Sequence, residues 1–359
     1  MKVRLIISAE NASWIIGKIG ERLVEELERS GVQATMGDTP DDSADINHWM
    51  SYWIVTGRHG RASTVFITHI DDSYKTAHIA AILQDRVDVG LCMSRDMMRA
   101  LTAWGIPEDR LWYVLPAFDA PPEPSRIRIA ITTRLYEDGR KREGLLIQLA
   151  KERDLSPFHF EIAGAGWDAV VPVLIQSGAS VNWLPGSADY QSDYPSILNS
   201  MRGCEYYLYL GMDEGSLGIL DALSLGLKTI ATPQGFHLDI PGGLTEPVES
   251  YSELVEVFDR LSNERSKRMA SVRDWTWKQY AADHLLVWET LLLGKRSGLA
   301  AALNGRGRYL AADSRRAVPI GLTRRTWSGF YRHSFSPSRM RDALARTRLT
   351  ERLRRLLGR

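Results

Sequence analysis

Two carboxylates flank a run of small residues in the second half of the chain. Glu214 and Asp221 stand seven positions apart, with Gly215, Ser216 and Gly218 between them. Free amides and the positive end of a helix dipole bind a phosphate without a metal, and small residues let it approach the backbone. On a continuous helix both acids would share one face, roughly 10 Å apart along the axis. We therefore expect a diphosphate between them, one acid bonding a sugar and the other a ribose; the alternative is an ordinary buried crossover with an acidic N-cap.

The patterns on either side predict the elements that must position these residues. An apolar run at 206–210 leads into the acidic turn, and an apolar-periodic stretch ends at Gly226 before a second apolar run at 229–231. This order predicts strand, loop, helix and strand, which places the loop at the carboxyl edge of a parallel sheet. Prolines gather between 116 and 124 and favour a linker near 117–126. A chain of 359 residues is long enough for two domains.

The acidic segment resembles the signature of retaining glycosyltransferases of family 4, a large group with the GT-B fold that uses sugar nucleotides. In that family a glutamate opens a glycine-rich turn, and a second acid follows before a small-residue helix, a glycine and a strand. Asp221 and the residues after it match the second half, through Gly226 and the run at 229–231. Asp213 has the family's spacing to Asp221, whereas Glu214 has the residue type and the following glycine but lies one residue closer. The resemblance favours Glu214 as the acid that contacts the sugar, with Asp213 as the alternative.

The cations that the resemblance assigns to the diphosphate lie in an earlier segment. The strand-like segment at 127–132 continues into Arg134 and then Lys141, similar to the family's arginine and lysine, although Thr133 replaces a glycine and the loop is longer. Arg140 competes with Lys141 for the lysine's role, and a surface turn rich in basic residues is the alternative. Preorganised cations would stabilise the charge that a leaving diphosphate gains in the transition state. The resemblance also implies donor contacts at Gly215, Ser216, Leu217, Gly218, Gly164 and Gly17.

Histidines supply the chemistry of the first half. His69 follows the apolar run at 65–67 in the order Thr-His-Ile, which resembles the family's strand whose histidine contacts the transferred sugar near the reacting centre. The resemblance implies that His69 is catalytic, and we expect Asp71 and His48 on the acceptor side. A structural histidine at a strand end, and a packed loop around His48, are the alternatives.

The resemblance implies an α/β architecture of the GT-B type, with two Rossmann-like domains whose parallel sheets face a central cleft. Near the N-terminus, an apolar strand at 3–8 is followed by Gly17 and Gly20, which predict a turn before a helix at 21–29. A tryptophan-rich stretch resembles the family's closing helix. The predicted division of the chain is an acceptor-side domain at 1–120, a donor-side domain at 126–274, a helix crossing back to the first domain at 275–293, and a basic, partly amphipathic tail at 294–359.

Composition bounds the compartment and the chemistry. Two cysteines, Cys92 and Cys204, cannot build a disulfide framework, and no signal peptide or membrane span is found, so a cytoplasmic location is expected. No Cys/His cluster has zinc spacing and no strand ends in Asp-x-Asp, so no metal or cofactor is expected besides the nucleotide-diphosphate sugar substrate. The resemblance implies retaining hexosyl transfer to a glycan or lipid-linked acceptor, in bacterial-type glycan assembly. A sugar-nucleotide 2-epimerase and a catalytically inactive binding protein of the same fold are the alternatives.

The formal charge of +1 hides a separate basic tail. Residues 295–359 hold 17 basic and 3 acidic residues, whereas the rest of the chain holds 28 basic and 41 acidic ones. In the tail, Leu349, Leu353, Leu356 and Leu357 follow helical spacing with arginines between them. Such a helix suits an anionic membrane surface, near which each cation contributes about 1 kcal/mol. Docking on the chain's own acidic body is the alternative, and nucleic acid ranks last because no recognised module is present.

Overall fold

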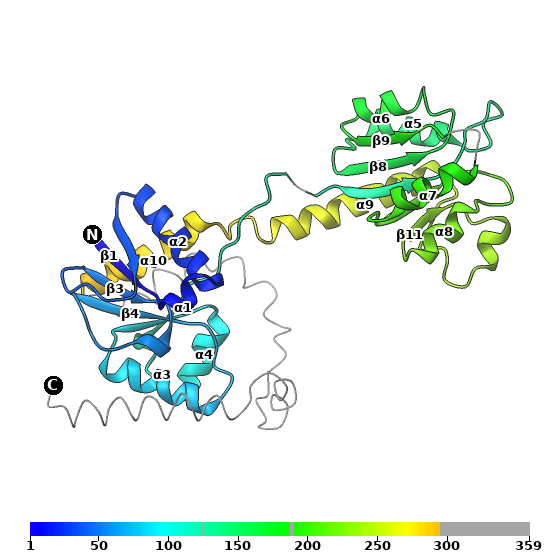
Figure 1. Cartoon of the computed structure of the whole chain (residues 1–359). Helices are drawn as coiled ribbons and strands as arrows, with labels where there is room; N and C mark the ends of the chain where they lie inside the picture. Colours follow the sequence, from blue (N-terminus) through cyan, green and yellow to red (C-terminus); the bar gives the residue numbers. More distant parts are fainter. Residues whose placement is uncertain (124, 187–189, 295–359) are drawn as a thin grey trace. The chain divides into compact units, whose positions relative to one another are not determined.

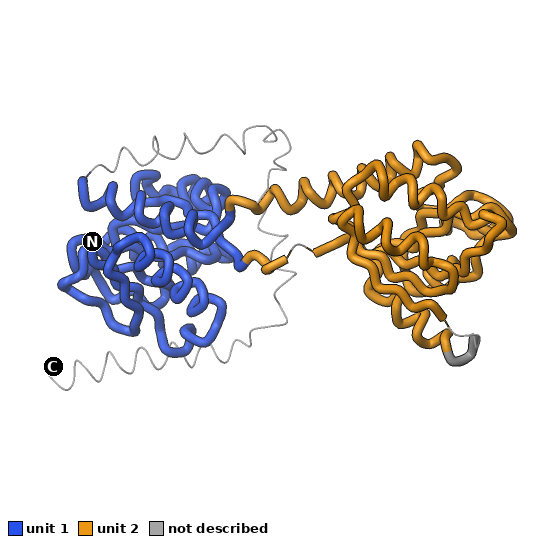
Figure 2. The backbone as a smooth tube through the Cα atoms, turned by 90° about the horizontal axis from the view of Figure 1, so that it is seen from above, with its two compact units in different colours: residues 1–119, 275–359 blue, residues 120–274 orange. Residues whose placement is uncertain are grey.

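The computed structural model describes residues 1–123, 125–186 and 190–294. The basic tail, with its expected amphipathic helix, lies outside these residues. The described chain forms two compact units (Figure 2): unit 1 holds residues 1–119 and 275–294, and unit 2 holds residues 120–274. No described helix is both long enough and apolar enough to cross a lipid bilayer.

Unit 1 is built on a six-stranded sheet in the order β2-β1-β3-β4-β5-β6, and every pair of neighbouring strands is parallel (Figure 1). The strands are β1 (Lys2–Ile6), β2 (Gln33–Gly37), β3 (Ile46–Trp49), β4 (Ala62–Ile67), β5 (Val89–Cys92) and β6 (Leu111–Tyr113). Every residue of β4 and β5 is buried, because both faces of this parallel sheet are covered.

Helices cover both faces of this sheet. Side chains of α2 and α10 pack on one face, and side chains of α3 and α4 pack on the other. The helices and short 3-10 turns are α1 (Ala9–Ala12), α2 (Ile15–Arg29), η1 (Tyr52–Ile54), α3 (Ser73–Asp85), α4 (Arg95–Ala103), η2 (Glu108–Arg110) and α10 (Trp277–Leu292). Helix α10 comes from the far end of the described chain and buries Tyr280, Ala281, His284, Val287, Trp288 and Leu291 in unit 1.

Helix α2 begins earlier than the sequence predicts. It starts at Ile15, so Gly17 and Gly20 are buried inside the helix rather than placed in a turn that faces a ligand. A Cβ atom at Gly17 would lie 1.9 Å from the Ala12 carbonyl oxygen, so the glycine is needed for α1 and α2 to pack closely. The turn expected at these glycines is therefore wrong, and Gly17 packs α2 against α1; a contact between Gly17 and the donor stays a prediction.

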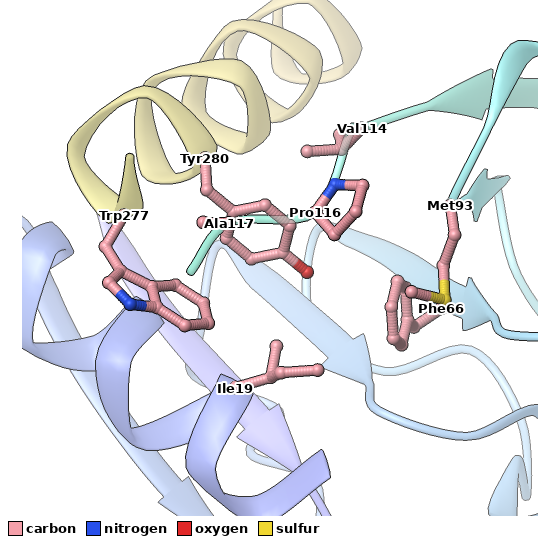
Figure 3. Close-up of a pocket in the computed structure, with 8 residues that line it drawn as sticks. All are labelled: Ile19, Phe66, Met93, Val114, Pro116, Ala117, Trp277 and Tyr280. Carbon is pink, nitrogen blue, oxygen red and sulfur yellow. The ribbon is translucent and has the colours of Figure 1, made fainter. Parts of the chain in front are cut away.

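An apolar hollow lies in unit 1 between α2, α10 and the ends of β4, β5 and β6 (Figure 3). The Tyr280 hydroxyl points into it and is the one titratable group of the lining. The lining residues are Ile19, Phe66, Met93, Val114, Pro116, Ala117, Trp277 and Tyr280. With this lining, the hollow offers apolar surface rather than a set of catalytic groups.

Unit 2 repeats the design with a second six-stranded parallel sheet, in the order β12-β11-β10-β7-β8-β9. Its strands are β7 (Ile127–Ile131), β8 (Phe158–Ala163), β9 (Ser180–Leu184), β10 (Tyr206–Tyr209), β11 (Lys228–Ala231) and β12 (Glu246–Pro247). Its helices and 3-10 turn are α5 (Glu143–Glu152), α6 (Val171–Gln176), α7 (Tyr190–Met201), α8 (Gly218–Ser224), η3 (Gly235–Asp239) and α9 (Tyr251–Ala270). Side chains of α5, α6 and α9 pack on one face of the sheet, and those of α7 and α8 pack on the other.

The strand orders locate one point in each sheet where the chain reverses its direction of winding. In unit 1 this point lies between β1 and β3, and in unit 2 it lies between β7 and β10. Open α/β sheets bind ligands outside the carboxyl ends of the strands at such a point. The predicted α/β class, with two Rossmann-like domains on parallel sheets, is confirmed.

Candidate functional site

The reversal point of unit 2 brings together the two segments that the sequence singled out. Thr132 directly follows β7, and its hydroxyl lies 3.1 Å from the Tyr207 hydroxyl of β10. The Tyr207 hydroxyl lies in turn 2.8 Å from the Ser216 hydroxyl, which fixes the acidic loop against the end of β7. A Cβ atom at Gly218 would lie 2.2 Å from the Thr132 hydroxyl oxygen, so a glycine is required there for the loop to sit this close to the sheet.

Lys141 is the least exposed cation of this site. Its ammonium donates to Asp213 Oδ2 at 2.5 Å and to the Tyr209 hydroxyl at 2.7 Å, and its side chain is only 12% exposed. The Tyr209 hydroxyl and the Gly215 amide donate to the other Asp213 oxygen at 2.5 and 3.1 Å. Burial alone raises the pKa of Asp213, but the hydrogen bonds from Lys141, Tyr209 and Gly215 together bring that pKa below its usual value. Asp213 therefore orients Lys141 in this structure.

Glu214, the next residue, has a different environment. Its side chain is exposed, and its carboxylate makes no hydrogen bond or ion pair with any part of the chain that the structure describes. Its backbone is nevertheless held, because its carbonyl oxygen accepts from the Phe236 amide at 3.3 Å. Of the two neighbouring acids, Asp213 is engaged with Lys141 and Glu214 is free to meet a ligand.

The two acids of the predicted pair do not lie on one helix. Helix α8 begins at Gly218, so Asp221 lies in its first turn while Glu214 lies in the loop before it. The expected arrangement of both carboxylates along one helix face is therefore wrong. Asp221 Oδ1 accepts from the Tyr194 hydroxyl of α7 at 2.7 Å.

His237 in η3 is a site residue that the sequence did not reveal. The Ser216 amide donates to His237 Nε2 at 2.9 Å, and His237 Nδ1 lies 3.0 Å from the Thr232 carbonyl oxygen. A carbonyl only accepts, so Nδ1 carries the proton and Nε2 is the acceptor. The signal available in the sequence was weak: His237 follows a buried strand by six residues, without a recognisable spacing to the acidic loop.

This bond changes the set of amides that a phosphate could meet. The Gly215 amide donates to Asp213 and the Ser216 amide donates to His237, so neither is free as expected. The Leu217 and Gly218 amides have no hydrogen-bond partner among the described residues. The expected cradle of four amides is therefore reduced to these two.

The remaining predicted residues of unit 2 lie around the loop after β7. Arg134 and Arg140 are exposed, and their guanidinium carbons lie 5.6 and 4.1 Å from the centre of the Tyr136 ring. Arg140 also lies 3.6 Å from Asp138, so it belongs to the surface turn whereas Lys141 points to the acidic loop. Gly164 has φ +144°, and a Cβ atom there would lie 2.2 Å from the Thr133 carbonyl oxygen, which gives it a packing role at the end of β8.

In unit 1, His69 lies just beyond the carboxyl end of β4. Its Nε2 lies 3.2 Å from the Tyr52 hydroxyl and its Nδ1 lies 2.8 Å from the Thr68 hydroxyl. Burial, and then the charge of Lys75, lower the pKa of His69, although Asp71 opposes this effect from 4.0 Å. Half of the side chain is exposed, so a neutral imidazole at this edge can exchange hydrogen bonds with a ligand.

His48 is a core residue, which corrects its expected place on the acceptor side. It lies in β3 with no exposed surface, and its Nδ1 lies 2.8 Å from the Thr64 hydroxyl. Its ring centre lies 5.4 Å from His284 and 5.6 Å from Trp288, both on α10. Burial, together with the nearby His284, holds the pKa of His48 well below its usual value. A ring enclosed in this way cannot reach an acceptor.

Comparison with known proteins gives likenesses of fold. No protein-family model matches the chain, and no curated protein matches it. The chain is similar to a structure of Anabaena Alr3699/HepE in complex with UDP and glucose, at 12% identity and a TM-score of 0.28, over 85% of this chain and 100% of that one. It is also similar to a glycosyltransferase from Rickettsia africae (11% identity, TM-score 0.30, 81% and 98% covered). A third similar structure is the catalytic domain of cholesterol-α-glucosyltransferase from Helicobacter pylori, at 16% identity and a TM-score of 0.30, over 45% of this chain and 99% of that one. Values this low carry no functional conclusion.

The geometry itself limits what the unit 2 site can do. It places a largely enclosed ammonium, an exposed guanidinium and a free carboxylate around the reversal point of a parallel sheet. Within the described ranges, no three His, Cys, Asp or Glu side chains gather as a metal site would require. The groups present are suited to binding an anion beside a polyhydroxylated ring.

Proposed function

We propose that the chain is a glycosyltransferase that moves a sugar from a nucleotide-diphosphate sugar to a hydroxyl acceptor. The observation that carries this proposal is Lys141, held 2.5 Å from Asp213 at the carboxyl edge of the sheet, next to the free carboxylate of Glu214. When the sugar leaves, its diphosphate gains negative charge, and a cation already in position stabilises that charge without reorganisation.

Each group of the site has a proposed part. Lys141 and Arg134 bind the diphosphate, Asp213 orients Lys141, and Glu214 bonds the hydroxyls of the sugar. Asp221, which already accepts a hydroxyl hydrogen bond from Tyr194 at 2.7 Å, bonds the ribose. Asp213 is not proposed to bond the sugar, because each of its two carboxylate oxygens already accepts a hydrogen bond within the chain.

Unit 1 is proposed to receive the acceptor, a glycan or a lipid-linked hydroxyl. His69 presents a half-exposed ring beyond β4, and the nearby Asp71 carboxylate lies 4.0 Å from it. Asp71 is itself bonded to Lys75 at 2.5 Å, which orients it at this edge.

The finer features of the proposal rest on the resemblance to family 4. They are retention at the anomeric carbon, catalysis without a metal, and work in the cytoplasm on bacterial-type glycans or glycolipids. Lys141 and Arg134 supply the positive charge that a metal would otherwise bring to the diphosphate. The basic charge and the helical leucine spacing of residues 295–359 favour contact with an anionic membrane surface, and the lack of a recognised module puts nucleic acid last.

The test compares two lysines that share a local arrangement. Lys141 lies 5.0 Å from the Tyr209 ring centre at the carboxyl edge, and Lys228 lies 5.7 Å from the Tyr206 ring centre at the start of β11. Thermal-shift screening with UDP, GDP and ADP sugars identifies the donor, since a ligand bound to the folded state raises the melting temperature. Turnover of that donor is then measured with an acceptor panel.

Lys141→Ala is expected to lower turnover about hundredfold or more, and Lys228→Ala is expected to leave it unchanged. Full activity in both Lys141→Ala and Arg134→Ala would contradict the assignment of this site. A donor that is isomerised without any acceptor would instead identify a 2-epimerase.

A further inference from the structure

Three aromatic rings form a nearly parallel group in unit 1, here called the aromatic platform. Trp53 belongs to η1, and Tyr74 and His78 lie one turn apart on α3. The Trp53 ring centre lies 4.8 Å from that of His78, at an interplanar angle of 19°, and 6.1 Å from that of Tyr74, at 24°. The Tyr74 and His78 rings deviate from parallel by only 9°. The three rings therefore stack with a common orientation.

Two rings of the platform are exposed although they are large, whereas His78 is half-buried. Trp53 is 46% exposed and Tyr74 is 56% exposed. A grouped set of exposed aromatic rings marks an interaction site more often than scattered single ones do. Because η1 follows β3 and α3 follows β4, the platform lies at the carboxyl edge of the sheet, where open α/β folds bind their ligands.

Tyr52 joins the platform to His69. The Tyr52 ring centre lies 5.0 Å from that of Trp53, and the Tyr52 hydroxyl lies 3.2 Å from His69 Nε2. Tyr52 itself is buried, so it holds both neighbours in fixed positions. A ligand stacked on Trp53 would therefore have the half-exposed His69 side chain close by.

The charges beside the platform discriminate between kinds of ligand. Asp72 caps the start of α3 by accepting a hydrogen bond from the Lys75 amide at 2.7 Å. Its side chain is 50% exposed, and it lies within one helical turn of Tyr74. Asp71 precedes it and pairs with Lys75. Two carboxylates against one ammonium disfavour a phosphate or an anionic lipid, whereas a pyranose is neutral. A pyranose also has an apolar C–H face that stacks on a ring, and hydroxyls that bond carboxylates and imidazoles.

We propose that Trp53 and Tyr74 bind a pyranose ring of the acceptor, stacked on the platform with its hydroxyls toward Asp71, Asp72 and His69. The inference rests on the proposed glycosyltransferase function and narrows it: the acceptor is a saccharide or the sugar headgroup of a glycolipid. The platform sets the specificity for that sugar, and His69 lies where the accepting hydroxyl would be presented.

Direct binding to the full chain tests the platform without any transfer reaction. Methyl β-D-glucopyranoside and methyl β-D-galactopyranoside are titrated by saturation-transfer NMR against the wild type, Trp53→Ala, Tyr74→Ala and Trp53→Phe. Trp104→Ala is the matched control, because Trp104 at the end of α4 is 53% exposed in the same unit. Loss of one stacked ring is expected to weaken binding about fivefold to tenfold, while Trp53→Phe restores part of it and Trp104→Ala has no effect.

UDP titrations of the same variants separate the two proposals. Variants of Trp53 and Tyr74 that bind UDP as the wild type does, but bind the glycosides more weakly, would support the platform. A wild type that binds the glycosides but not UDP would contradict the proposed donor site and leave the platform standing. The platform is overturned if the wild type binds neither glycoside, if Trp53→Ala binds them as well as the wild type, or if Trp104→Ala weakens them equally. Trp53→Ala that loses only binding to phosphatidylglycerol vesicles would assign the rings to a membrane surface instead.

Discussion

Acid is expected to destabilise unit 1 through two histidines enclosed in its core. His48 on β3 and His284 on α10 are fully buried, with ring centres 5.4 Å apart. His284 Nδ1 donates to the Tyr280 carbonyl oxygen at 2.9 Å, and the Nε2 atoms of both rings lack a partner among the described residues. A proton added to either ring would place a charge in this apolar surrounding without compensation.

The size of the effect follows from the pKa values. Burial lowers the pKa of His284 from 6.5 to about 4. Between these two values the unfolded chain binds a proton at His284 and the folded chain does not, so the free energy of unfolding falls as the pH falls. A pKa difference of this size corresponds to about 3 kcal/mol, and His48, whose pKa is also lowered, adds to it. A domain is stable by only about 5–15 kcal/mol, so the loss is large.

Urea unfolding at a series of pH values measures this slope, with hydrogen exchange of α10 peptides reporting on unit 1. His284→Met removes one titrating ring and is expected to remove about half of the slope between pH 6.5 and pH 4. His59→Gln is the control, because His59 pairs with Asp42 at 2.8 Å outside the core, and it should keep the steep slope. Stability that stays level across this range, or a His284→Met variant as steep as the wild type, would refute the reasoning.

Two further predictions concern the acidic loop of unit 2. Asp213→Asn is expected to lower the stability of unit 2 by about 1–2 kcal/mol, because Lys141 loses its charged partner. Glu214→Gln is expected to keep the melting temperature and to lower turnover about hundredfold. The opposite pattern in melting and turnover assays would exchange the roles of the two acids. His237→Ala removes the acceptor of the Ser216 amide and is expected to raise the donor KM several-fold, and His237→Gln, whose side-chain oxygen can accept that bond, should restore it. Equal KM values for both His237 variants would reduce this residue to packing.

Local patterns in the sequence were sufficient to predict the main architecture. Apolar runs at 65–67 and 129–131 became buried parts of parallel strands, because a strand covered on both faces has no polar side to show. The acidic loop was placed correctly at a sheet edge for the same reason, since its flanking runs form β10 and β11.

Contacts between distant segments decided the rest. His48 was expected on the acceptor side because the sequence does not show that α10, from the far end of the described chain, packs against it. Gly17 read as part of a ligand-facing turn because the close approach of α1 is invisible in the sequence. His237 had no recognisable spacing, since its bond to Ser216 depends on the path of the chain after β11. Sequence spacing likewise left Arg140 and Lys141 as competitors for the lysine's role. The conformation of the turn distinguishes them, because it directs Lys141 to Asp213 and leaves Arg140 on the surface.

The division of the chain has a consequence for its synthesis. Residues 120–274 form one continuous stretch, so unit 2 has all its strands and helices as soon as that stretch has left the ribosome. Residues 1–119 emerge earlier but must wait for α10, whose Trp288 and five other buried side chains fill their core. Domains usually mature in the order in which they are translated. Here unit 1 is begun first and completed last. A nascent chain stopped before residue 275 would expose to chaperones the apolar surface that α10 covers in the folded unit.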